Sequence, residues 1–227
     1  MMGLLMQLPR KSVEPMVLAI EGASEKAVRA MQQFISEGAW DDGVLLGQHW
    51  REVDHDLGEP EGVLTLDGSD FHKQGKESVG VKRQYCGELG KRANCQAGVF
   101  VGYSSSQGYA LLDRRLYLPQ EWVEDAAYAE RRAKCGIPPE TRFKTKIELG
   151  LDMLTALHAA NSVRCQWLMC DEGFGRDGTF LDRVALLDLW YFAEVPQDTR
   201  VWRARPVVGL PRPSGKGRKP TKEEGVR

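Results

Sequence analysis

Two short apolar segments each run directly into an aspartate, and this pattern constrains the fold more than any other feature of the chain. Residues 63–66 (VLTL) precede Asp67, and residues 166–170 (QWLMC) precede Asp171. Short apolar runs of this kind are typical of buried strands. The carboxyl ends of strands in an α/β fold form the sheet rim at which such folds place their sites. If the two strands are neighbours, the carboxylates converge and need a hard cation such as Mg²⁺.

The spacing of the two aspartates leaves a second interpretation open. Aspartate at the end of a strand is more often a turn former or a helix cap than a metal ligand. The chain also has other acids close to both positions, among them Asp70, Glu172 and Asp177. The strand pattern therefore indicates a metal site only as one of two alternatives.

The first 60 residues predict helices. Ser24 can cap a helix that carries an apolar stripe and ends at Gly38, and Asp41 or Asp42 can cap a second helix that stops at Gly58. The stripe of the first helix consists of Ala27, Val28, Met31, Phe34 and Ile35. We expect a small helical region before the first strand.

The rest of the chain predicts a mixed α/β layout. Residues 94–103 and 109–117 predict a hairpin around a polar turn, and residues 190–195 predict a further strand. Helices are expected after Pro119, after Thr145 and from Asp177 or Thr179. An antiparallel hairpin beside parallel strands gives an α/β fold with a mixed sheet flanked by helices.

Composition excludes some classes of protein. No apolar run approaches the roughly 20 residues that would span a membrane. The five cysteines form no C-x-x-C pair, which favours a reducing cytoplasm over a disulfide framework. Residues 196–227 carry nine Lys/Arg against three Asp/Glu and are rich in Pro and Gly, so we expect a disordered basic tail. Such a tail fits a nucleic-acid contact, and it fits a solvated terminus equally.

Several longer motifs resemble a family of bacterial insertion-sequence transposases, the DDE superfamily endonucleases. They are LDGSDFHKQGKESVGVKRQYCGELGKRANCQAGVFVGY (66–103), LLDRRLYLPQEW (111–122), CDEGFGRD (170–177), WYFAEVPQDTRVW (190–202) and PRPSGKGRKPT (211–221). The motifs occur in the family's order and cover nearly the whole chain.

The resemblance implies a ribonuclease-H-like fold with an Asp-Asp-Glu triad that binds Mg²⁺ or Mn²⁺. Asp67 matches the first acid and Asp171 the second. The implied function is metal-dependent cleavage and strand transfer of transposon-end phosphodiesters, with transposon ends and target DNA as partners. The implied domains are a partial, DNA-binding helical region (1–60), an incomplete catalytic core (61–195) and a basic tail that begins an insertion (196–227).

The third acid of the family's triad has no match in this chain. In the family it is a glutamate on a later helix, whereas Glu194 falls within a predicted strand and Glu223 and Glu224 fall in the tail. We therefore expect a truncated transposase of the bacterial cytoplasm, either still active or an inactive remnant, or one product of a split reading frame. The alternatives are a fragment that binds DNA or dimerises with an intact transposase to regulate it, and a fragment that does not fold stably.

Six basic residues lie between the first acid and the hairpin, and we expect them to contact DNA phosphates. They are Lys73, Lys76, Lys82, Arg83, Lys91 and Arg92. An ordinary solvated surface is the alternative. Within the same stretch Tyr85 could stack on a splayed base, but packing in the core is the preferred interpretation.

Overall fold

The computed structural model describes residues 7–10, 12–22, 24–38, 41–199, 204, 207–210 and 224–226. Its contacts divide the chain into two compact units, Met1–His49 and Trp50–Arg227. The division falls inside a helix, whereas the sequence placed the boundary after residue 60.

The N-terminal unit is helical, as predicted. It contains α2 (Val13–Glu21), α3 (Glu25–Glu37) and the first part of α4 (Asp42–Leu57). The Ser24 hydroxyl accepts a hydrogen bond from the Ala27 N–H at the start of α3, and Gly38 ends this helix. The apolar stripe of α3 is not buried, since Met31 and Ile35 are both exposed. The stripe predicted the helix correctly but did not predict a buried face.

A six-stranded mixed sheet forms the centre of the second unit. Its order is β2-β3-β1-β5-β6, and β4 pairs with β3. β1 runs antiparallel to β3, which forms the predicted hairpin with β4, and it runs parallel to β5, which is itself parallel to β6. The strands are β1 (Val63–His72), β2 (Lys82–Cys86), β3 (Lys91–Ser105), β4 (Gly108–Tyr117), β5 (Trp167–Cys170) and β6 (Trp190–Ala193). The predicted α/β class is confirmed, and the sheet is compatible with a ribonuclease-H-like fold.

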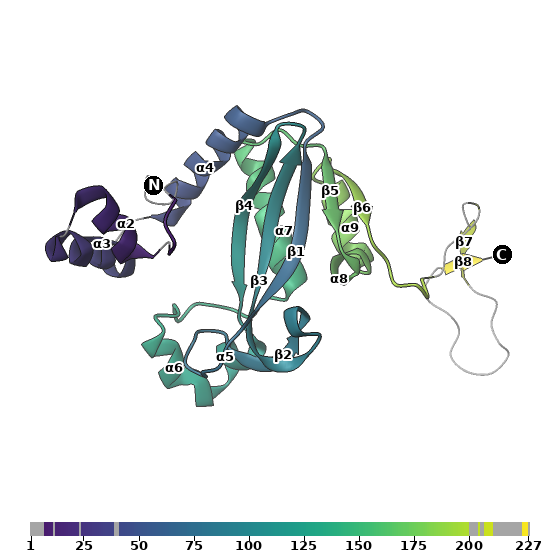
Figure 1. Cartoon of the computed structure of the whole chain (residues 1–227). Helices are drawn as coiled ribbons and strands as arrows, with labels where there is room; N and C mark the ends of the chain where they lie inside the picture. Colours follow the sequence, from purple (N-terminus) through teal and green to yellow (C-terminus); the bar gives the residue numbers. More distant parts are fainter. Residues whose placement is uncertain are drawn as a thin grey trace. The chain divides into compact units, whose positions relative to one another are not determined.

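Helices flank this sheet (Figure 1). The longest of them in this unit, α7 (Lys146–Ala160), packs on β3 and β4 and starts in a capping box between Thr145 and Glu148. The other helical segments are η1 (Gly87–Leu89), α5 (Gln120–Glu124), η2 (Ala126–Tyr128), α6 (Ala129–Lys134), α8 (Glu172–Gly175) and α9 (Gly178–Ala185).

Alternate residues of β1 face opposite sides of the sheet. Leu64 and Leu66 are buried, and a Cβ on Gly150 of α7 would lie 2.8 Å from the Leu66 side chain, so these residues face α7. Thr65 and Asp67 project to the other side, since side chains alternate along a strand. We call these two sides the covered face and the open face of the sheet.

The first strand extends beyond its predicted end. We expected β1 to stop at Leu66, but it continues to His72 because residues 67–72 pair with β3 from Phe100 to Cys95. The ladder that joins β1 to β5 does stop at Leu66 and Cys170. Asp67 is therefore at the end of the parallel ladder, although it is in the middle of its own strand.

The basic tail differs in part from the expected disorder. A short antiparallel pair joins β7 (Val207–Gly209) to β8 (Glu224–Val226). Glu224 begins the second of these strands. The remaining prediction for the tail falls mainly on residues outside the described part of the chain.

Candidate metal site and nucleic-acid interface

The two aspartates are brought together by neighbouring parallel strands. Leu66 of β1 is the partner of Cys170 of β5 at the last position of the ladder. Asp67 and Asp171 are the next residues on each strand, so both leave the ladder at the same rim. Strand neighbours in a sheet are about 4.8 Å apart, which places the two residues side by side.

A third carboxylate shares the pocket that these aspartates line. The pocket has a volume of about 200 Å³ and is lined by Asp67, Asp171 and Glu194, together with apolar residues that include Met169 and Phe192. Glu194 follows β6 directly, and its N–H donates to the Cys170 carbonyl at 3.0 Å. The prediction that Glu194 lies within a strand is wrong because β6 ends at Ala193.

A repeated pattern in the sequence indicates Glu194, although the family motifs do not. β1, β5 and β6 share one pattern, an apolar stretch followed by an acid: LTL before Asp67, LMC before Asp171 and YFA before Glu194. All three strands run parallel to one another. Acids that follow parallel strands meet at one rim, so the repeated pattern predicts three carboxylates there.

Both aspartates now make hydrogen bonds to the backbone. Asp67 Oδ1 accepts from the Gly68 N–H at 2.6 Å, and Asp171 Oδ1 caps α8 by accepting from the Gly173 and Phe174 N–H groups at 3.0 and 3.3 Å. The side chains of both residues are exposed. In the part of the chain that is described, no three His, Cys, Asp or Glu side chains are grouped closely enough to hold a metal ion.

The donor set nevertheless has the chemistry that a hard divalent cation requires. All three acidic groups of the pocket offer carboxylate oxygens, which suit Mg²⁺ and Mn²⁺ and not softer metals. Burial, with the negative charges of Asp171 and Glu194 behind it, raises the pKa of the Cys170 thiol to about 11. Asp171 and Glu194 thus place negative charge close to Cys170, at the rim that also offers the carboxylate oxygens.

Asp70 does not belong to this pocket, although it is only three residues from Asp67. It projects to the covered side, where Oδ2 accepts from the Gly87 N–H at 2.7 Å and Oδ1 is 3.7 Å from Lys146 Nζ. Asp70 thus ties β1 to η1 and to the start of α7, which is a structural role.

The structure separates the six predicted DNA-contacting residues into groups. Lys73 and Lys76 belong to the loop between β1 and β2, which is held against β3 by Asn94 Nδ2 through the carbonyls of Lys73 and Gly75, at 2.9 and 2.6 Å. Asn94 is on the open face of β3, because it is an even number of residues from Phe100, the partner of Asp67. The loop therefore crosses the open face.

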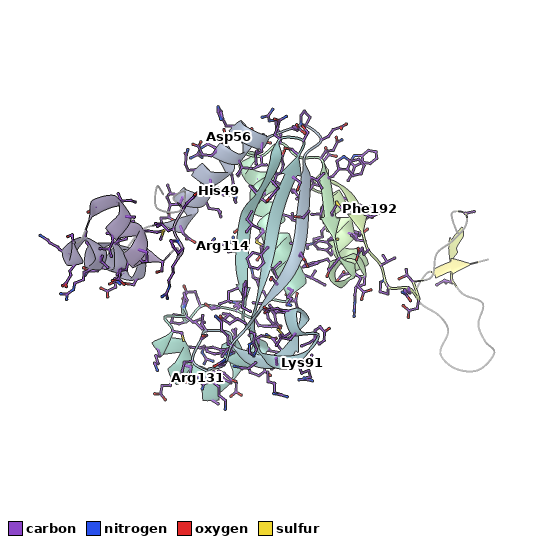
Figure 2. All side chains as sticks on the ribbon, in the orientation of Figure 1. His49, Asp56, Lys91, Arg114, Arg131 and Phe192 are labelled. Atoms are coloured by element: carbon purple, nitrogen blue, oxygen red, sulfur yellow. The ribbon has the colours of Figure 1, made fainter. Side chains whose placement is uncertain are left out.

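The remaining four residues are on the ribbon formed by β2 and the first part of β3. Arg83 and Arg92 share one side of the ribbon and are exposed, whereas Lys82 points to the other side and pairs with Glu121. Lys91 is exposed at the first position of β3, and Figure 2 shows it at the same end of this unit as Arg131. DNA contact by these residues remains a prediction.

The exposure of Tyr85 differs from the prediction. We preferred packing in the core, but its side chain is 64% exposed on the same side of β2 as Arg83. The buried cluster of the ribbon consists of Cys86, Ala93 and Cys95 on the opposite side. Tyr85 is thus available to a partner.

A mixed sheet with acids at the rim of its parallel strands defines a class of protein with a ribonuclease-H-like architecture. A family model of the DDE superfamily endonucleases matches residues 1–227, so the chain belongs to this family. A search of curated proteins gives no match. Endonucleases of this family act on DNA and generally use divalent metals. Among the described residues, no helix is both long enough and apolar enough to cross a bilayer.

Proposed function

We propose that this protein cleaves and transfers phosphodiester bonds at the ends of an insertion sequence, with Asp67 and Asp171 as ligands of Mg²⁺ or Mn²⁺. The observation that carries the proposal is the ladder that ends at Leu66 and Cys170, since it delivers both acids to one pocket. Membership of the family supports DNA as the substrate.

The residues of the pocket have separate tasks in this proposal. Asp67 and Asp171 would hold the cation through carboxylate oxygens, and two backbone N–H groups at the start of α8 donate to Oδ1 of Asp171. Glu194 is the third acid available at the same rim, in place of a glutamate on a later helix. When bound, the cation supplies the positive charge that activates a nucleophilic hydroxyl and stabilises the leaving oxygen.

The basic residues would hold the substrate. Lys73, Lys76, Arg83 and Arg92 are on the loop and ribbon that extend from the pocket along the open side of β3. Phosphate contacts of this kind position a nucleic acid without reading its sequence. Lys82 is a weaker candidate, because Glu121 already neutralises its ammonium group.

The test combines nicking with direct metal binding. Purified protein is incubated with supercoiled plasmid that carries the DNA flanking its gene, with Mg²⁺, Mn²⁺ or EDTA, and Mn²⁺ binding is measured separately by calorimetry. Asp67→Asn and Asp171→Asn are expected to lower nicking by about 10³-fold or more and to weaken Mn²⁺ binding. Asparagine keeps the capping ability of residue 171, so the fold should be unchanged.

Two further variants complete this test. Glu194→Gln is expected to reduce nicking by less than the aspartate variants, and Glu172→Gln, an exposed acid outside the pocket, should leave it unchanged. Nicking that survives both Asp67→Asn and Asp171→Asn would show that the site assignment is wrong. DNA binding without any metal-dependent nicking would favour the alternative, a regulatory fragment that binds DNA or an intact transposase.

A further inference from the structure

The ribbon of β2 and β3 presents an exposed aromatic ring between two arginines. Tyr85 is directly opposite Arg92 in the ladder, and Arg83 is two residues before Tyr85 on the same side of β2. All three side chains are exposed. Residues opposite each other in an antiparallel pair have Cβ atoms about 5 Å apart, so Arg92 lies beside the tyrosine.

The two arginines of this surface are not neutralised. Among the described residues, neither Arg83 nor Arg92 has an ion-pair partner within 4.0 Å. Two of the nearby acids are occupied elsewhere, since Asp70 accepts from the Gly87 N–H and Glu77 pairs with two basic residues of the α6 helix. A third, Glu88, is exposed in the turn after β2 and accepts from the His72 N–H at 3.5 Å. The surface therefore carries positive charge that a polyanion would complement.

This aromatic and basic surface is on the same side of β3 as the metal pocket. Arg92 and Phe100 are eight residues apart, and Phe100 is the partner of Asp67. At about 3.3 Å per residue, the separation along the strand is about 26 Å. The loop with Lys73 and Lys76 crosses the same side between them. A strand of DNA that extends from Asp67 along this side would meet Lys73 and Lys76 before it reaches Arg92.

We propose that Tyr85, flanked by Arg83 and Arg92, is a stacking platform for an unpaired base of single-stranded DNA. The ring favours an unpaired base because the faces of bases inside a duplex are covered by their neighbours, whereas a splayed base has a free face. The guanidinium groups neutralise the flanking phosphates. This inference rests on the proposed function, since it takes the strand to be the DNA that is cleaved at Asp67.

The platform would hold a nucleotide at a defined distance from the bond that is cut. When the DNA between the cleavage point and the platform is B-form duplex, about 26 Å equals roughly eight steps of 3.4 Å. The chain would thus favour DNA that is melted about eight nucleotides from the cleavage point, and Tyr85 would stabilise the melted state.

The experiment measures binding without catalysis. A 20-nucleotide single strand with one 2-aminopurine, and the duplex made from it, are titrated with the full chain in EDTA. Tyr85→Ala is expected to weaken single-strand binding by about 5- to 150-fold, the equivalent of ~1–3 kcal/mol for one stacked base, and to abolish 2-aminopurine quenching. Duplex binding should change little. Tyr85→Trp should retain both the affinity and the quenching.

Matched variants separate stacking from charge and from unfolding. Tyr109→Ala removes another exposed tyrosine, 87% accessible on β4, and should leave single-strand binding unchanged. Arg83→Ala and Arg92→Ala should each lower the salt dependence of single-strand binding by about 0.7 in slope. The melting temperature of each variant is measured alongside.

Three results would overturn the platform: no single-strand binding by the wild type, no effect of Tyr85→Ala, or equal losses for single strand and duplex. The proposed function fails separately. If Tyr85→Ala does not change single-strand binding but Mg²⁺-dependent nicking is intact, only the platform is wrong. If binding depends on Tyr85 and no nicking occurs, only the cleavage function is wrong.

Discussion

The covered and open faces of the sheet use the same strands for different purposes. On the covered face, Leu64 and Leu66 of β1 are at most 2% exposed and pack beneath α7. On the open face, Asp67 is exposed and lines both the metal pocket and a second pocket of about 380 Å³ that extends to Phe71 and Leu111. One period-two strand thus supplies the core with one set of residues and the candidate site with the other.

The apolar residues of the open face make the contrast stronger. Met169 and Phe192 are 46% and 67% exposed, and Trp167 and Trp190 contact each other through rings 5.5 Å apart at the same edge of the sheet. Figure 2 shows Phe192 at the side formed by β5 and β6. Stability should therefore depend mainly on the covered face, and function on the open one.

The largest expected effect is on a leucine of the covered face. Leu66→Ala should lower the free energy of unfolding by ~2–5 kcal/mol, because it removes a fully buried side chain from beneath α7. Leu111→Ala, on the open face and 65% exposed, should change it by about 0.5 kcal/mol or less. Urea unfolding of the two variants measures the difference. Equal losses would mean that both faces are packed in solution, and the comparison would then fail.

A polar exception on the covered face gives the next prediction. The Asp113 carboxylate is 2% exposed and is partner to Val101, whose side chain is also buried. It accepts from Arg115 Nη1 at 2.5 Å and from the Arg114 N–H at 2.7 Å. Arg115→Ala would leave the carboxylate buried without its main donor, and should cost ~1–3 kcal/mol.

Substitution of the acidic partner should lower the free energy of unfolding by less. Asp113→Asn keeps an acceptor for Arg115 and removes the buried charge, whereas the Arg115 side chain is 36% exposed and can reach water. The two variants are compared by thermal melts at neutral pH. If Asp113→Asn is the more damaging of the two, the ion pair itself contributes the stability and the desolvation argument is wrong.

Much of this fold could be predicted from the sequence, because local signals agreed with the final structure. Ser24 and Thr145 act as helix caps at the predicted places, and the polar turn at Ser105 joins the predicted hairpin. The apolar runs before Asp67 and Asp171 predicted two strands that each run into an acid, and the structure pairs these strands in parallel. Acids that follow neighbouring parallel strands lie at the same rim of a sheet, so no further tertiary contact is needed to bring these two together.

Other features could not be predicted because only tertiary pairing produces them. The residues after Asp67 include glycine, serine and aspartate, which are poor strand formers, and β3 alone keeps them extended. The sequence KRQYC gave no clear signal for β2, so the exposure of Tyr85 was missed. The pattern of apolar residues cannot show which face of a sheet a helix will cover. Met169 and Phe192 were therefore predicted to be in strands, but their exposure was not predicted.

The start of α7 gives a smaller effect, which varies with pH. Thr145→Ala removes the capping box of α7, the helix that packs on the covered face, and should lower the free energy of unfolding by ~1 kcal/mol. The N–H and hydroxyl of Thr145 lower the pKa of Glu148 below its usual 4.5. A lowered pKa stabilises the fold above the unfolded value, so this contribution is lost as pH falls below 4.5. Urea unfolding in steps from pH 7 into this acidic range should show the difference between wild type and Thr145→Ala shrinking.

The last prediction concerns the reactivity of a thiol at the edge of the covered face. Cys165 lines a pocket of about 210 Å³ beside Leu64 and Leu154 of the core. Burial, together with the negative charge of Asp54, raises its pKa to about 11.

Because only the thiolate reacts, Cys165 in the folded protein should be alkylated about 100-fold more slowly at pH 8 than a thiol with the ordinary pKa of 9.0. Mass spectrometry after brief iodoacetamide treatment measures each cysteine separately. The raised pKa also makes the free energy of unfolding depend on pH, because the folded state favours the neutral thiol. The contribution of Cys165 to stability is complete below pH 9 and is lost as pH rises towards 11. Fast labelling of Cys165 at pH 8 without unfolding would show that the edge of the covered face opens, and that the two faces differ less than their burial indicates.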